Sequence, residues 1–313
     1  MHARPRLCNR LVWVALATLA AIGADPASAT ENGASVYPAG VETVVPGIQP
    51  HPGKSTINEF TAYYAANELD NAQGKSSMPE FKLRVVATAI KVTHNWGWKA
   101  LGGTVESVVA LPLIYQQLHI PPGKFSRYSL GNVDMIPASV TYHRGDLHWF
   151  YEADFFLPGA AYNAADALNI GQHNLAAAPV LGFTYLPHKG ATEVSSRLSY
   201  IVNGPDKATG YHSGNEFVWE YTLDRALARD KFAAGLNGDY CQQTTGDTLH
   251  GAAYDGGFKG RTLQVGPQVR FPMGKGGGFA FKYYRDTLVQ NRPRGNAFWF
   301  QISVPVKLSR GHA

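Results

Sequence analysis

Cysteine is nearly absent from the chain, and so are long apolar runs. The sequence of 313 residues contains two cysteines, and Cys241 is the only one beyond residue 29. A single cysteine excludes an intrachain disulfide and a metal site built from several thiolates, so we expect Cys241 to be a small buried filler. After residue 29 there is no run of 18 apolar residues, which excludes membrane-spanning helices.

Charge is also scarce. Charged residues make up 16% of the chain, against 45% hydrophobic and 12% aromatic residues, and the formal net charge is +5. This mild positive charge is not gathered into the basic face that nucleic-acid binding requires, so we expect no nucleic-acid partner. The mean hydropathy of -0.18 indicates that the many apolar residues are interspersed with polar ones.

Residues 1–29 have the features of a secretory signal peptide. Arginines precede an apolar stretch at 11–22 that is too short to span a bilayer, and a small-residue Ala-Ser-Ala sequence at 27–29 marks the expected cleavage site. Thr30 would then begin the mature chain. Cleavage removes three arginines and one aspartate, which lowers the formal net charge from +5 to +3.

The rest of the chain consists of short segments in which apolar and polar residues alternate. In 215–223, one face carries Phe217, Trp219, Tyr221 and Leu223, and the other carries Glu216, Glu220 and Thr222. Segments 147–157, 192–202, 231–243 and 262–271 show the same period of two, which indicates strands. A soluble sandwich also alternates, but its polar face seldom carries so many aromatic residues beside the loops.

We therefore predict an all-β fold, a transmembrane antiparallel β-barrel of about twelve strands. The expected strands lie near 56–67, 80–93, 103–118, 133–143, 147–157, 174–186, 191–203, 214–226, 230–243, 260–272, 277–290 and 296–307. An even number of strands places both ends of the barrel on one side of the membrane. Aromatic residues flank the segments at both ends, as the interfacial girdles of a barrel require.

The connections between these strands are in turn long and short, as in outer-membrane barrels. The mostly long set is 68–79, 119–132, 158–173, 204–213, 244–259 and 291–295, and the mostly short set is 94–102, 144–146, 187–190, 227–229 and 273–276. Within the short set, 94–102 is longer than a periplasmic turn should be. The expected parts of the chain are a signal peptide at 1–29, a separate segment at 30–53, the barrel at 54–308 and a tail at 309–313.

Residues 30–53 are rich in proline and glycine and show no periodicity. Such a segment does not form a strand or a helix of its own. Two arrangements are open at this stage. The segment could lead into the barrel from the periplasm, or it could fold into the lumen as a plug.

Several short motifs follow one another in order along the mature chain. They are Glu31-Asn32-Gly33, Tyr37-Pro38, His94-Asn95-Trp96-Gly97, Phe156-Leu157-Pro158-Gly159, Ser213-Gly214-Asn215-Glu216-Phe217, Gln242-Gln243-Thr244-Thr245, Gly266-Pro267-Gln268-Val269 and Asn291-Arg292-Pro293-Arg294-Gly295. In their order and spacing the chain resembles the MetA-pathway phenol-degradation family, and more narrowly its SphA-type members. The resemblance implies an outer-membrane barrel tied to the catabolism of aromatic or other hydrophobic compounds, and it brings no catalytic residues.

The inner face of the barrel is the first candidate for a functional surface. The residues expected to line the lumen are Arg84, Glu152, Asp154, Arg197, Glu216, Glu220, Asp239, Gln268, Arg270 and Lys282. Two tyrosines in long loops, Tyr162 and Tyr254, would capture an aromatic solute by stacking. The lumenal charges could also pair with one another in a filled interior, and a barrel of twelve strands has an intermediate width that permits either arrangement.

Motifs of catalysis or cofactor binding do not stand out. The sequence holds no H-E-x-x-H, phosphate-binding or dinucleotide fingerprint. Glu152 and Asp154 share a strand face, but a spacing of two residues produces this on any strand. We therefore expect no catalytic residue, no cofactor and no metal, and hence no enzyme.

The predicted function is that of an outer-membrane channel in a Gram-negative bacterium, for passive uptake of small hydrophobic or aromatic compounds. Its partners would be the solute, outer-membrane lipid and the barrel-assembly machinery, and it would act as a monomer. Two alternatives remain open. One is a structural or adhesin-like barrel without transport, and the other is a barrel hydrolase acting on lipid.

Overall fold

Twelve long strands form the body of the protein. The computed structural model describes residues 34–306 except 122, 229–230 and 275. The predicted signal peptide, the predicted mature start at Thr30 and the predicted tail lie outside these residues. The long strands are β1 (Ser55–Leu69), β2 (Lys82–Ala100), β3 (Gly103–Ile120), β5 (Val133–Arg144), β6 (Leu147–Leu157), β7 (Ala176–Tyr185), β8 (Thr192–Asn203), β10 (Glu216–Leu227), β11 (Phe232–Gln243), β14 (Arg261–Met273), β15 (Gly277–Gln290) and β16 (Pro293–Val306).

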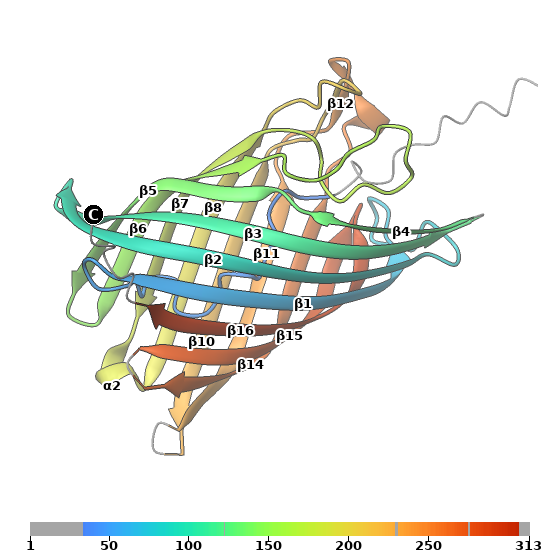
Figure 1. Ribbon diagram of the computed structural model, residues 1–313. Helices are drawn as coiled ribbons and strands as arrows, with labels where there is room; N and C mark the ends of the chain where they lie inside the picture. Colours follow the sequence, from blue (N-terminus) through green and yellow to red (C-terminus); the bar gives the residue numbers. More distant parts are fainter. Residues whose placement is uncertain (1–33, 122, 229–230, 275, 307–313) are drawn as a thin grey trace, which may run out of the picture.

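These strands close into a barrel (Figure 1). Each pairs antiparallel with its neighbours along the chain, and the first and last strands pair from Ser55 opposite Val306 to Leu69 opposite Pro293. The closed, all-β barrel of twelve strands predicted from the sequence is confirmed. The short elements lie in its connections: β4 (Gly123–Leu130), β9 (Tyr211–His212), β12 (Thr248–Leu249), β13 (Ala252–Ala253), the helical turn α2 (Pro187–Gly190) and the 3-10 turn η1 (Tyr254–Gly256).

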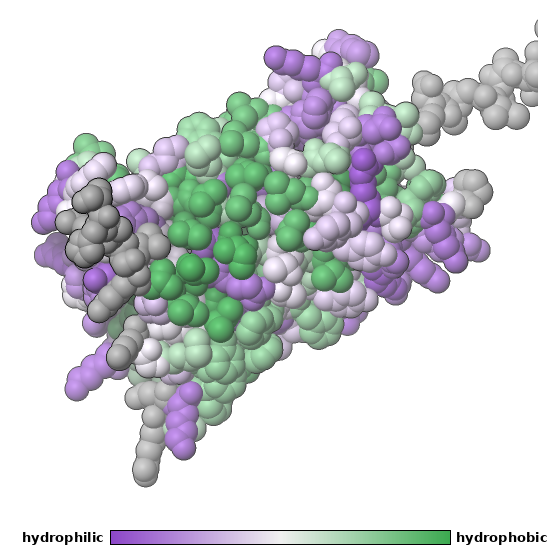
Figure 2. Space-filling model, viewed as in Figure 1, coloured by the Kyte–Doolittle hydropathy of each residue, from purple (hydrophilic) through white to green (hydrophobic). Residues whose placement is uncertain are grey.

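The outer surface of the barrel wall is apolar. Large side chains such as Tyr151, Leu223, Leu236, Phe281 and Phe298 point outward from five strands and are about half exposed. Figure 2 shows hydrophobic residues across the middle of the barrel and hydrophilic residues gathered toward both ends. An apolar belt between two polar ends is the surface of a barrel that crosses a lipid bilayer. In the described part of the chain, no helix is long and apolar enough to span a membrane.

Two connections differ from the expected ones. Segment 94–102 was expected to be a turn, but β2 runs on to Ala100 and only Leu101 and Gly102 form the turn, both with positive φ (52° and 82°). Such a two-residue turn fits the twist of paired strands. The expected loop 119–132 is mostly the hairpin of β3 with β4. Both extensions lie toward the ends of the barrel, outside the apolar belt (Figure 2). Apolar and polar residues do not need to alternate there, so these parts of the strands cannot be recognised from alternation.

Residues 34–47 of the segment before β1, drawn in blue, lie inside the barrel (Figure 1), and residues 51–53, which lead into β1, are exposed. Val36, Tyr37 and Val41 belong to the same buried cluster as Phe156 of β6 and Val218 of β10. Apolar burial of this kind stabilises the segment against the inner face of the wall. The larger apolar cluster of the described residues is therefore formed between the barrel wall and its own N-terminal segment.

Candidate functional site

Most of the residues expected to line the lumen do point into it. Nine of them lie on the inner face, and the side chains of all but the partly exposed Arg270 are almost fully buried: Glu152, Asp154, Arg197, Glu216, Glu220, Asp239, Gln268, Arg270 and Lys282. They come from β6, β8, β10, β11, β14 and β15. Because successive residues of a strand point to opposite faces, the apolar outer positions of these strands leave the polar ones inside.

Arg84 was expected in the lumen, and that expectation is wrong. On β2 the inner positions are those of Leu83 and Lys91, so Arg84 lies on the outer face. Its guanidinium donates hydrogen bonds of 2.7 Å to the carbonyl of Ala66 and of 2.7 Å to the side chain of Asn67. The residue lies near the end of β2 that joins a long loop, where an outward charge can reach water and satisfy strand carbonyls.

Arg197 lies at the centre of the buried charges. Its guanidinium contacts three carboxylates, those of Asp154 at 2.5 Å, Glu220 at 3.4 Å and Glu152 at 3.7 Å. It also lies 4.8 Å from the ring centre of Tyr37, so that the N-terminal segment covers it with an aromatic face. A fully desolvated arginine is stable only with such partners. The lumen at this level is filled rather than open.

The N-terminal segment is held by side chains of the wall. Glu220 accepts hydrogen bonds from the Tyr37 hydroxyl at 2.7 Å and from the backbone N–H groups of Gly40 and Glu42, each at 2.9 Å. From the other side of the lumen, Lys282 donates to the carbonyl of Gly40 at 2.7 Å. These are charge-assisted hydrogen bonds, which are roughly twice as strong as neutral ones.

The end of the segment nearer β1 is anchored in the same way. The N–H of Val45 donates to Glu193 at 2.7 Å, and the N–H of Gly47 donates to the Thr184 hydroxyl at 2.9 Å. Arg270 lies 3.2 Å from Glu193 and closes this cluster. A segment without regular structure must satisfy its backbone groups inside the barrel, and the wall supplies the acceptors.

Some lumenal charges were not singled out from the sequence. Glu42 forms an ion pair with Lys91 of β2, and Asp224 of β10 accepts from Arg270 at 3.0 Å. Asp224 continues the inward period of Glu216 and could have been found from the alternation. Lys91 follows small residues on a strand of weak alternation, so its inward position is visible only in the folded chain.

The N-terminal segment divides the lumen and leaves an apolar cavity on one side. This cavity has a volume of about 300 Å³ and lies against β1, β2, β3, β5, β6 and β16. Its apolar lining includes Phe60, Leu83, Ile114, Phe156 and Trp299. Alanines of β2 and β3 face it as well, and their small side chains leave the space unfilled.

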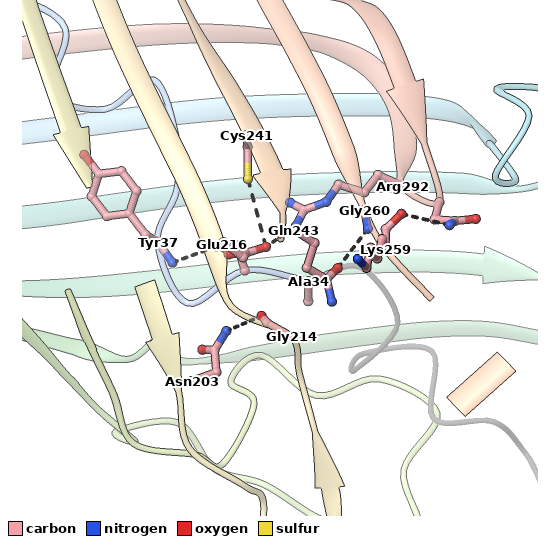
Figure 3. A network of polar contacts seen from close by, with 12 residues as sticks. Ala34, Tyr37, Asn203, Gly214, Glu216, Cys241, Gln243, Lys259, Gly260 and Arg292 are labelled. Atoms are coloured by element: carbon pink, nitrogen blue, oxygen red, sulfur yellow. Dashed lines mark hydrogen bonds and ion pairs between the residues drawn. The ribbon is translucent and has the colours of Figure 1, made fainter. Parts of the chain in front are cut away.

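A smaller and more polar cavity lies on the other side of the segment. It has a volume of about 160 Å³ and is lined by Asp239, Cys241, Thr262, Asp286 and Arg292, among others. Figure 3 shows a polar network that includes two of these residues: Arg292 and Cys241 both contact the carboxylate of Glu216, on β10. The two cavities are therefore chemically distinct.

The two tyrosines expected to capture a solute both make contacts within the loops. The ring of Tyr162 stacks on that of His173 at a centroid distance of 4.7 Å, and the His173 Nδ1 lies 2.9 Å from Asp206 Oδ1. Tyr254 packs edge-on against Tyr211 at 5.2 Å. Burial disfavours the charged form of Asp206, but hydrogen bonds led by that of His173 outweigh it and hold the pKa of this loop carboxyl below its usual value.

Fold and lumen together define a membrane-spanning β-barrel whose interior is occupied by its own N-terminal segment. The chain belongs to the family described as "Putative MetA-pathway of phenol degradation", whose model matches residues 66–302. This confirms the family indicated by the sequence motifs. No curated protein matches the sequence.

Solved structures of other barrels are similar to this one. An outer-membrane channel from Pseudomonas putida F1 shares 13% sequence identity with it, with a TM-score of 0.71, over 87% of this chain and 100% of the channel. The β domain of the Bordetella autotransporter BrkA shares 13% identity with a TM-score of 0.47, over 81% of this chain and 99% of that domain. The first of these similarities supports the barrel fold.

Proposed function

We propose that the protein is a channel of the Gram-negative outer membrane that admits small hydrophobic or aromatic molecules by passive diffusion. The observation that carries this proposal is the apolar cavity of about 300 Å³ inside the barrel. Its volume is that of a small-molecule binding pocket, and such pockets are lined mainly by apolar and aromatic side chains with a few polar groups. Membership of the phenol-degradation family supports the same class of solute.

Polar groups within the cavity would orient the solute. The side-chain oxygens of Asn132, Asp134 and Gln172 and the indole nitrogen of Trp299 lack hydrogen-bond partners among the described residues, and all four residues line the cavity. Buried polar atoms are normally paired, so these four are available to a ligand. A phenol hydroxyl would donate to one of these oxygens or accept from the indole N–H of Trp299, while its ring contacts Phe156.

The N-terminal segment would act as the gate. It forms one wall of the apolar cavity from Ala34 to Glu42, and its ion pair with Lys91 lies at the same cavity. In this arrangement the solute passes only when the segment shifts from its hydrogen bonds with the wall. Closure of the barrel leaves no unpaired strand edge to pair with a second chain, which is consistent with a monomer. We propose that the barrel-assembly machinery inserts it into the membrane.

The test is conductance of the refolded protein in a planar bilayer, with and without phenol, after a heat-modifiable gel shift has shown a folded barrel. We expect conductance steps that phenol blocks. Ala89→Trp places an indole in the apolar cavity and should abolish the block. Ile90→Trp, one residue along on the outer face, should leave it unchanged. Folded protein that neither conducts nor supports phenol uptake by cells would contradict the proposal.

A further inference from the structure

Two histidines face each other across the hairpin that joins β5 to β6. His143 and His148 are directly opposite in the register of the two strands, and their ring centres are 4.4 Å apart. Directly opposite side chains of an antiparallel pair are the closest neighbours across two strands. The two imidazoles are therefore brought together by the hairpin itself.

The pair lies on the inner face at one end of the barrel. The neighbouring pair, Tyr142 and Trp149, stacks at a centroid distance of 5.1 Å on the face of the outward Tyr151. Alternation places His143 and His148 on the opposite face. His143 is exposed and His148 is partly exposed, so an ion can reach both rings from water at the end of the barrel that carries the short turns.

The two nitrogens that point at each other are spaced as metal ligands are. The Nδ1 atoms of His143 and His148 lie 3.1 Å apart. With metal–nitrogen bonds of about 2.0–2.1 Å, two ligands lie about 2.9 Å apart at a right angle and about 3.3 Å apart at the tetrahedral angle. The observed distance falls between these values. A metal ion would take the place of the proton that one Nδ1 otherwise donates to the other.

The hairpin holds this spacing with little freedom. Its two-residue turn consists of Gly145 and Asp146, and the φ of +60° at Gly145 suits such a turn. His148 also pairs with β7, and a Cβ atom placed on Gly47 of the N-terminal segment would lie 2.9 Å from its carbonyl oxygen. Imidazoles that are fixed before binding lose little conformational entropy when they chelate an ion.

Water would supply the remaining ligands. In the part of the chain that the structure describes, no group of three or more metal-binding side chains is found. Asp146 adds a negative charge in the turn between the two histidines, whereas Arg144 lies on the other face of β5 by alternation. A site with two protein ligands and open positions suits reversible binding rather than a permanent structural ion.

We infer that His143 and His148 form a binding site for a divalent transition-metal ion at this end of the barrel. Imidazole nitrogen is a ligand of Cu²⁺, Ni²⁺ and Zn²⁺, and Cu²⁺ binds such ligands most tightly. The bound ion would tie β5 to β6 beside the point where the N-terminal segment passes His148. Occupancy of the site does not require conduction, so the inference stands apart from the proposed channel.

Binding of Cu²⁺ to folded protein without an affinity tag tests the inference. Copper is titrated at about pH 7.5, where free imidazoles are mostly neutral, and electron paramagnetic resonance reports the ligands. We expect a copper spectrum with hyperfine splitting from two nitrogens. Bound Cu²⁺ should also raise the midpoint of urea unfolding, because an ion that binds only the folded state stabilises it.

Two substitutions and a matched control identify the ligands. His143→Ala and His148→Ala should each weaken copper binding at least about tenfold, since loss of a direct ligand costs no less than loss of a residue that only orients one. The double variant should be little weaker than either single variant, because the chelate is lost with its first ligand. His188→Ala, which removes a histidine of α2 in the neighbouring turn, should leave the affinity unchanged.

Equal copper affinities of the wild type and of folded His143→Ala and His148→Ala would overturn the inference. A wild-type spectrum without nitrogen splitting would overturn it as well, and this result does not depend on the folding of any variant. Bilayer recordings then separate the inference from the proposed function. A silent bilayer with copper binding that depends on the pair would refute the channel and support the metal site, and conductance without copper binding would do the reverse.

Discussion

The hydroxyl of Tyr37 donates a 2.7 Å hydrogen bond to Glu220, a residue 183 positions further along the chain. The contact joins the N-terminal segment to the middle of β10, and both groups are buried. Arg197 lies against both partners, at 4.8 Å from the ring and 3.4 Å from the carboxylate. These three residues form one buried cluster, which fixes the position of the segment and also balances the charges of the wall. A substitution in the cluster therefore affects both the position of the segment and the charge balance of the wall.

Removal of residues 31–52 should increase single-channel conductance. The segment occupies the lumen and separates its two cavities, so its loss joins them into one wider passage. Planar-bilayer recordings of the deletion variant and the wild type provide the measurement, with the heat-modifiable shift as the control for folding. Conductance equal to that of the wild type would show that the segment does not limit passage.

Replacement of Arg197 by alanine should destabilise the barrel by about 3–5 kcal/mol, because the carboxylates around it are left buried without a counter-charge. Arg225→Ala is the matched control, since Arg225 lies on the same sheet at an exposed position of β10. Its effect should stay within about 0.5 kcal/mol. Urea unfolding in lipid vesicles measures both. Equal free energies of unfolding for the two variants would contradict the role of Arg197.

An arginine at position 236 should also destabilise the protein, for a different reason. Leu236 is 56% exposed on the outer face of β11, within the apolar belt. A charge near the bilayer midplane costs about 2–4 kcal/mol in barrels of this kind. Leu249→Arg, in β12 of a long loop, should have little effect. Urea unfolding in lipid vesicles measures this effect as well. A similar loss of unfolding free energy in both variants would place Leu236 outside the lipid.

The loop contact between His173 and Asp206 should be visible as a pH dependence. Because the pKa of Asp206 is lowered in the folded protein, the contact stabilises the loop above about pH 4, the usual range of a free aspartate, and is lost as the pH falls through the lowered value. The N–H of Ala208 donates to this carboxylate at 2.8 Å, so its NMR shift reports the titration.

We expect His173→Ala to move the midpoint of that titration upward, toward the usual aspartate value. His51→Ala, which removes an exposed histidine elsewhere, should leave the midpoint where it is. An identical midpoint in His173→Ala and the wild type would show that the histidine does not hold the carboxylate.

Alternation along the strands determined much of this protein. Phe217 and Leu223 face outward and Glu216 and Glu220 face inward because side chains alternate on any strand, and a lipid belt admits only apolar residues on one face. The number of strands and the closure of the barrel follow from that pattern. It failed where the constraint ends, at Arg84 and in the hairpin of β2 with β3, since these positions lie near the ends of strands, where an outward polar side chain can reach water.

Only the tertiary structure decided the path of residues 34–53. The segment has no period of its own, and its backbone is satisfied by carboxylates of β8 and β10 that are remote in sequence, such as Glu193 for Val45 and Glu220 for Gly40. No local pattern can encode such contacts, because they exist only once the barrel has closed. The sequence thus determined the wall and its two faces, and the folded chain determined how the lumen is filled and where it is left empty.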